Sequence, residues 1–121
     1  MAHGTVNWFQ IDADDPAGAQ RFYGQLFNWT FAGDPDSGDA YRLAKPAGGE
    51  QAIGGIADTR GESPNHAMFM VVVDDVAAAV EHAERLGGKV EAPPVTTPDG
   101  LTFAKLRDPA GNTFGVYAPP A

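Results

Sequence analysis

The chain has 121 residues, of which 43% are hydrophobic and none is cysteine, and its formal net charge is −8. This length fits a single domain, 1–121, and the lack of cysteine excludes disulfides, thiolate metal sites and thiol nucleophiles. Residues 1–60 hold eight acids and four bases, as do residues 61–121, so no basic stripe suits nucleic acid. No apolar run approaches the ~18 residues that span a bilayer, and no signal peptide is evident, so we expect a cytoplasmic protein without a membrane partner.

The first segment, residues 5–13, alternates in the manner of a half-buried strand. Phe9, Ile11 and Ala13 point to one side, and Trp8 and Gln10 point to the other. We expect the first set to pack under a helix and the second to line a concave face of the sheet, where small molecules usually bind.

The next segment has the signals of a helix. Asp15 is a suitable N-cap, and Pro16 is favoured at the first helical position. Asn28 suits a left-handed end. An apolar stripe that should face the sheet consists of Ala19, Phe22, Tyr23 and Leu26. Further strands are expected near 29–33, 40–45 and 52–57, with a turn at 34–38 and a linker at 58–65.

The second half repeats the first at a spacing of 60 residues. Asp14-Asp15 reappears as Asp74-Asp75, Leu26 as Leu86, and Gly55 as Gly115. A fixed period this long indicates two copies of one supersecondary unit. The second copy predicts a strand at 66–73, a helix from Asp74 or Asp75 to Gly87-Gly88, and strands near 89–92, 101–106 and 112–118. The predicted fold is α+β: two tandem βαβββ units, at about 5–57 and 66–118, that form a cupped mixed sheet.

Three motifs resemble the vicinal oxygen chelate superfamily, which includes glyoxalase I, extradiol dioxygenases and the bleomycin-binding resistance proteins. They are the opening Trp8-Phe9-Gln10 followed by Asp14-Asp15-Pro16, the pair of Val73-Asp74-Asp75-Val76 with Leu86-Gly87-Gly88, and Asp108-Pro109-Ala110-Gly111-Asn112. The resemblance covers nearly the whole chain, and it implies the paired βαβββ fold. It also implies a homodimer, which free sheet edges favour as well.

The resemblance further implies four positions for metal ligands, one in the first and one in the last strand of each unit. The matching residues here are Trp8, Gly55, Met68 and Gly115. None of them can donate to a divalent metal. We therefore predict a metal-free member of the superfamily that has no cofactor.

The predicted ligand-binding residues share the concave face and are Trp8, Gln10, His66, Met68, Met70 and Tyr117. Trp8 could stack on a planar ligand or fill the space of the absent metal, and Gln10 could bind a ligand or satisfy a buried backbone group. His66 could act as a general base or be an ordinary strand-end histidine. Tyr41, Arg42 and Phe103 are weaker candidates, since their facing cannot be assigned from sequence.

A concave face with few convergent polar groups is better suited to binding a ligand than to breaking its bonds. The leading hypothesis is a metal-independent binder of a small organic molecule, in sequestration, resistance or an accessory role. The alternative is an enzyme of the glyoxalase type, either a metal-dependent lyase or dioxygenase or one that uses His66. A third hypothesis is a dimeric protein whose cup is plugged by Trp8.

Overall fold

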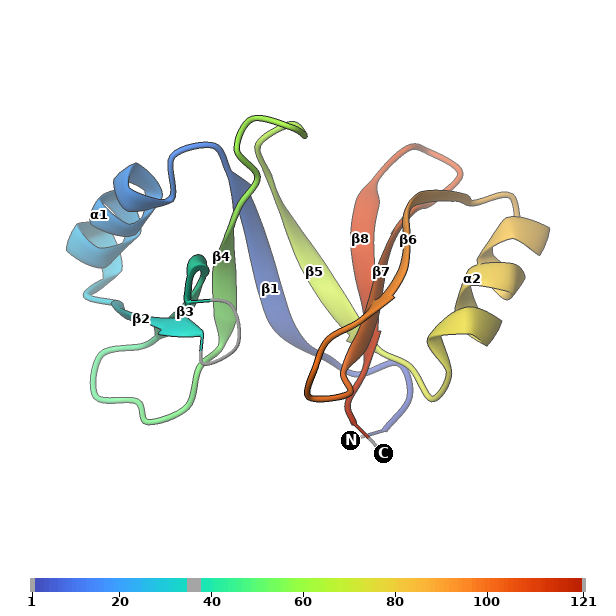
Figure 1. Ribbon diagram of the computed structural model, residues 1–121, viewed down its shortest axis with the longest axis horizontal. Coiled ribbons are helices and arrows are strands. Elements are labelled where there is room, and N and C mark those ends of the chain that lie inside the picture. The colour runs from blue at the N-terminus through green and yellow to red at the C-terminus, as the bar shows by residue number, and fades with distance from the viewer. Residues whose placement is uncertain (1, 35–37, 121) are drawn as a thin grey trace. The chain divides into compact units, whose positions relative to one another are not determined.

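The structure is a computed structural model that describes residues 2–34 and 38–120. Its elements, in chain order, are β1 (Val6–Ala13), α1 (Pro16–Phe27), β2 (Thr30–Asp34), β3 (Gly38–Lys45), β4 (Gly54–Asp58), β5 (His66–Val72), α2 (Val76–Arg85), β6 (Lys89–Thr96), β7 (Thr102–Arg107) and β8 (Thr113–Ala118). Two copies of the order βαβββ are thus present (Figure 1), and the predicted α+β fold class is confirmed. The turn expected at 34–38 lies partly outside the described residues, because 35–37 are not among them.

The chain divides into two compact units. The N-terminal module is Trp8–Ala67, and the C-terminal module is Met68–Ala121 together with Met1–Asn7. The segment that precedes β1 thus packs with the second copy. Gly4 N–H donates to Val72 O at 2.7 Å, and Val72 N–H donates to Thr5 O at 2.9 Å.

The N-terminal module has the strand order β2-β3-β4-β1, in which β1 is parallel to β4 and the other pairs are antiparallel. Its side under α1 is aromatic. Phe9 stacks on Trp29 with ring centroids 5.3 Å apart, and Trp29 stacks on Tyr23 of α1 at 5.8 Å. Phe9 therefore lies on the helix side of β1, as the alternation predicts.

Helix α1 begins and ends at the predicted residues. The Asp15 side chain accepts from Gly18 N–H at 3.1 Å, and Asn28 is left-handed with φ 59°. The predicted stripe is wrong in part, because Phe22 is 61% exposed and Leu26 is 58% exposed. None of the twelve residues of α1, all of which are described, is fully buried. Bulky aromatic side chains fill the layer between α1 and the sheet, so only part of the predicted apolar stripe can reach the sheet.

The C-terminal module has the order β5-β8-β7-β6, and α2 packs on one side of it (Figure 1). Its core is aliphatic and consists of Val73, Val76, Ala104, Leu106 and Val116. The parallel pair repeats the register of the first module at the predicted spacing of 60. Gln10 lies opposite Gly55, and Met70 lies opposite Gly115.

Two details of the second copy differ from the sequence prediction. The repeat of 60 places Gly88 at the position of the left-handed Asn28, but the left-handed residue after α2 is Gly87, with φ 94°. Strand β6 runs on through Pro93 and Pro94, because register shifts interrupt its pairing with β7 there. At an edge strand, proline has few ladder hydrogen bonds to lose.

Candidate functional site

The face of the N-terminal module that points away from α1 carries a chain of hydrogen bonds. Trp8 Nε1–H donates to Tyr41 Oη at 3.0 Å, and Tyr41 O–H donates to Gln10 Oε1 at 3.3 Å. Gln10 Nε2–H then donates to Asp12 Oδ1 at 2.9 Å. We call these four residues the Trp8 network. Trp8, Tyr41 and Gln10 each donate to another member of the network, so the network fixes the ring of Trp8.

The Trp8 network is largely removed from water at its far end. Gln10 is 8% exposed and Asp12 is 3% exposed. The printed partners of the Gln10 side chain are the side chains of Tyr41 and Asp12, so whether Gln10 also contacts a ligand stays a prediction. Sequence reasoning missed Asp12, although its place two residues after Gln10 on the same strand was the available signal.

Gly55 explains why Tyr41 can lie where it does. A Cβ at Gly55 would overlap the Tyr41 ring, so the ring rests on bare backbone of β4. Gly55 is one of the positions that match a metal ligand of the superfamily. In this chain the missing side chain is replaced by an aromatic ring from β3.

In the C-terminal module a side chain also takes the space beside a strand glycine, but this side chain is a thioether rather than an aromatic ring. A Cβ at Gly115 would overlap the sulfur of Met70, so the Met70 thioether lies over the backbone of β8. Met68 is 4% exposed and Met70 is 5% exposed. Soft, apolar side chains thus fill this position, and a thioether is a poor ligand for a hard cation.

Tyr117 lies on β8, two residues after Gly115 and on the same face. Its hydroxyl donates to Asn7 Oδ1 at 2.7 Å. Burial raises the pKa of the Tyr117 hydroxyl, and its hydrogen bond with the Asn7 side chain opposes this rise. Tyr117 therefore stays neutral at pH 7.

His66 lies at the start of β5, in the N-terminal module. It lines a surface hollow of about 340 Å³ beside α1, with Ala19, Phe22, Tyr23 and Asn65 among the other lining residues. Asn65 anchors this end of the linker, because its side chain exchanges two hydrogen bonds with Asp14, at 3.0 and 3.1 Å. The structure therefore places His66 at a hollow next to the helix, which Asp12 of the Trp8 network also lines.

The predicted site residues thus fall into two groups. Trp8, Gln10 and His66 belong to the N-terminal module, and Met68, Met70 and Tyr117 belong to the C-terminal module. Their contact with a ligand stays a prediction.

The residues at the four matched positions do not fit a metal ion. Indole, thioether and glycine offer no hard donor, and the space beside both glycines is filled by Tyr41 and Met70. Across residues 2–34 and 38–120, no three histidine, aspartate or glutamate side chains come together in a way that could hold a cation. Helices in this same part of the chain are all too short or too polar to cross a membrane.

Known proteins resemble this chain in sequence. It is 33% identical over 120 residues to "Putative glyoxylase CFP32" of Mycobacterium tuberculosis, which covers 94% of this chain and 45% of that protein. It is 32% identical over 117 residues to "Anthracycline biosynthesis protein DauV" of Streptomyces sp., covering 93% of this chain and 41% of that protein. The chain thus spans less than half the length of these two relatives.

A solved structure gives the same fold. The Mn(II)-bound glyoxalase from Novosphingobium aromaticivorans superposes with a TM-score of 0.65 at 19% identity, over 100% of this chain and 41% of that one. The family sequence model of the glyoxalase-like domain matches residues 8–117. Since this match takes in both βαβββ copies, the chain belongs to the glyoxalase-like domain family.

Proposed function

We propose that this chain binds a small organic molecule without a metal, in sequestration, resistance or an accessory role. The observation that carries the proposal is which residues occupy the four positions that match the metal ligands of the superfamily. Trp8, Gly55, Met68 and Gly115 supply no hard donor, and Tyr41 and Met70 occupy the space that the two glycines leave.

The Trp8 network supports binding rather than chemistry. Trp8, Tyr41 and Gln10 each donate within the network, and Trp8 is held in place, so this face offers a fixed aromatic side chain more than groups poised to move a proton. Rigid aromatic rings lose little conformational entropy when they contact a ligand. The relative named for anthracycline biosynthesis supports a role toward a small organic molecule.

The second candidate is an enzyme of the glyoxalase type. The relative named as a glyoxylase and the Mn(II)-bound glyoxalase favour it. His66, at the hollow beside α1, is the candidate base in this case. Such an enzyme would act as a lyase or dioxygenase, with or without a metal.

A thermal-shift screen of a small-molecule library tests the proposal, with wild type, Trp8→Ala and His66→Ala compared. We expect hits that disappear in Trp8→Ala and persist in His66→Ala. Trp8→Phe is the intermediate control, because it keeps a smaller planar ring and removes the Nε1 donor to Tyr41. Turnover of a hit that vanishes in His66→Ala would favour the enzyme. If wild type gives no hits and the thermal-shift profile of Trp8→Ala is unchanged, the result would favour a face that Trp8 plugs and that binds nothing.

Metal analysis of purified, tag-free protein decides the metal question separately. We expect less than one equivalent of tightly held metal per chain. One equivalent of Zn, Ni, Mn or Fe would contradict the proposal and revive the metal-dependent alternative. The homodimer and the cytoplasmic location also stay proposals.

A further inference from the structure

A second hollow, of about 410 Å³, lies in the N-terminal module between α1 and β2. Its volume is within the range of roughly 300–1,000 Å³ that is usual for small-molecule sites. Trp29 and Phe31 line it on the sheet side. The residues of α1 that line it share one side of the helix and are Gln20, Arg21, Gly24 and Gln25. Since α1 covers this side of the sheet, the hollow lies on the side opposite to the Trp8 network.

The charge of this hollow differs from that of the whole chain. Among the described residues that line it none is acidic, and Arg21 is a base. Arg21 is exposed, and it has no ion pair or hydrogen bond with another side chain in the described part of the chain. A chain with a net charge of −8 thus keeps an unpaired guanidinium at the mouth of a hollow.

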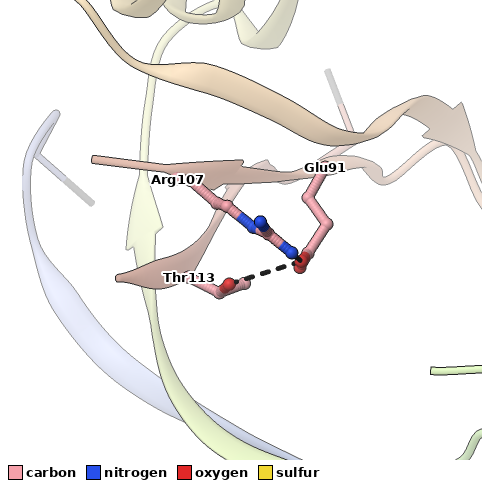
Figure 2. A network of polar contacts seen from close by, with 3 residues as sticks. All are labelled: Glu91, Arg107 and Thr113. Atoms are coloured by element: carbon pink, nitrogen blue, oxygen red, sulfur yellow. Dashed lines mark hydrogen bonds and ion pairs between the residues drawn. The ribbon is translucent and has the colours of Figure 1, made fainter. Parts of the chain in front are cut away.

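Arg107 in the other module shows how an arginine is paired elsewhere in this chain. It donates to Glu91 Oε1 from Nε at 2.9 Å and from Nη2 at 2.5 Å. Thr113 Oγ1 donates to the same oxygen at 3.5 Å, as Figure 2 shows. The charges of Arg107 and Glu91 therefore offset each other, and the group leaves little charge for a ligand.

Arg42, on β3, is paired less completely. Its Nη1–H donates to Gln20 Oε1 at 2.6 Å, and its Nε–H is buried without an acceptor among the described residues. No described carboxylate forms an ion pair with it. A buried donor without an acceptor costs free energy, so this guanidinium would gain from negative charge nearby. Its contact with Gln20 places that positive charge beside the hollow.

The bond to Arg42 also determines how the Gln20 amide is turned. A guanidinium group has only donors, so Gln20 must give it the amide oxygen and direct its Nε2–H groups elsewhere. These N–H groups have no acceptor among the described residues, and unlike Arg42 Nε they are open to solvent. Gln20 and Arg21 therefore both have unpaired donors at the hollow, which is the arrangement that suits an oxyanion.

We propose that this hollow binds the carboxylate or another oxyanion of a small planar organic molecule. Arg21 and Gln20 donate to the oxyanion, and Phe31 and Trp29 contact the planar body. Arg42 is a positioning residue, because it acts through the amide of Gln20. The inference goes beyond the proposed function, since it assigns a second site on the other side of the sheet from the Trp8 network.

A matched pair of probes tests this inference. They are 2-naphthoate, an anion, and 2-naphthamide, a neutral molecule of similar shape, and calorimetric titration measures the affinity for each. We expect wild type to bind 2-naphthoate about tenfold more tightly, the effect typical of one charge-assisted hydrogen bond. Acetate, which has the carboxylate without the rings, should bind more weakly than 2-naphthoate by at least about tenfold.

Two variants locate the site. Arg21→Gln removes the exposed guanidinium, and the preference for 2-naphthoate should fall nearly to unity. Gln20→Glu keeps the size of the side chain but places a carboxylate beside Arg42. It should weaken 2-naphthoate by at least about tenfold and leave 2-naphthamide within about twofold. Because Arg42 gains an ionic partner, the urea midpoint of Gln20→Glu should also rise, so a loss of 2-naphthoate binding cannot be ascribed to unfolding.

Matched controls make the same changes of charge elsewhere in the N-terminal module. Arg60→Gln and Gln51→Glu both alter exposed residues that do not line the hollow, and each should leave the preference unchanged. Equal affinity of wild type for 2-naphthoate and 2-naphthamide overturns the inference. So does a preference that persists in both Arg21→Gln and Gln20→Glu or that the controls reduce equally, and so does the absence of binding by either probe.

Discussion

At Gly55 the lack of a side chain lets the Tyr41 ring lie on the backbone of β4, within bonding distance of Trp8. Gly115 and Met70 repeat the arrangement in the other module with a thioether. The two glycines thus determine which side chain lies on this face of each module, although a glycine by itself weakens a strand.

Gly55→Ala tests this role. The new methyl group would overlap the Tyr41 ring, so the ring must move and its hydrogen bonds to Trp8 and Gln10 lengthen or break. We expect a loss of about 1–3 kcal/mol in the free energy of unfolding, as measured by urea denaturation.

The matched control is Gly24→Ala within α1, where a Cβ would meet its nearest neighbour, Trp29 O, at 3.4 Å. That change should stabilise the protein by about 0.5–1 kcal/mol, because alanine favours helix more than glycine does. Equal effects of the two changes would show that Tyr41 does not depend on Gly55.

Sequence alone could identify part of the candidate site. Alternation along β1 placed Trp8 and Gln10 on one face, and the repeat pointed to both glycines. Tyr41 could not be assigned, because its face depends on the pairing of β3 with β4, which is a long-range contact.

The helices and strands follow local signals closely, and the departures have long-range causes. Asp15 caps α1, as predicted, and of the two candidates for α2, Asp74 and Asp75, the N-cap is Asp75. Most strand ends lie within one or two residues of the expected position. The orientation of α1 was harder to predict, because Phe9, Trp29 and Tyr23 occupy the layer between helix and sheet. Packing of residues far apart in sequence overrides the helical stripe there.

The cap of α2 offers a test at this level. Asp75 Oδ1 accepts from Ala78 N–H at 3.0 Å, and Asp75→Ala removes that acceptor. We expect a loss of about 1 kcal/mol in unfolding free energy, measured by circular dichroism in urea. Asp74→Ala is the neighbouring control. Its side chain is 85% exposed and lies 3.8 Å from His3 Nδ1, so its loss should change stability by less than about 0.5 kcal/mol.

The turn between β7 and β8 makes stability depend on pH. The Asn112 side chain, and then the backbone N–H groups of Asn112 and Ala110, lower the pKa of Asp108 from its ordinary value of 3.8. Because the folded pKa is the lower one, ionised Asp108 stabilises the fold above pH 3.8, and this contribution is lost as pH falls through the folded value.

We therefore expect wild type to exceed Asp108→Asn in urea midpoint at neutral pH, with the difference shrinking below pH 3.8. Parallel urea titrations of the two proteins at several pH values measure it. A difference that stays constant down to about pH 2 would show that the carboxylate does not act through its charge.

At the scale of the molecule, α1 leaves apolar surface uncovered. Phe22, Leu26 and Phe27 are 61%, 58% and 49% exposed. Large exposed apolar side chains that gather on one element commonly mark an interaction surface. This observation supports the proposed homodimer.

Sedimentation equilibrium at about 100 µM should therefore give the mass of two chains. Association should strengthen with added salt, because each chain carries a net charge of −8 and salt screens the repulsion. Replacing Phe22 and Leu26 together by serine should shift the equilibrium toward monomer. Leu86→Ser, at a residue 66% exposed beyond α2, is the control. A monomeric wild type at both low and high salt would remove the proposal.

The contrast between the aromatic and the aliphatic module has a spectroscopic consequence. Both tryptophans, Trp8 and Trp29, lie within Trp8–Ala67, so emission excited near 295 nm originates in one half of the molecule alone. Far-ultraviolet circular dichroism, by contrast, reports on α1 and α2 together. If the halves unfold as one cooperative unit, the two signals share a midpoint; if they unfold separately, the curves part, and no label has to be attached to see it.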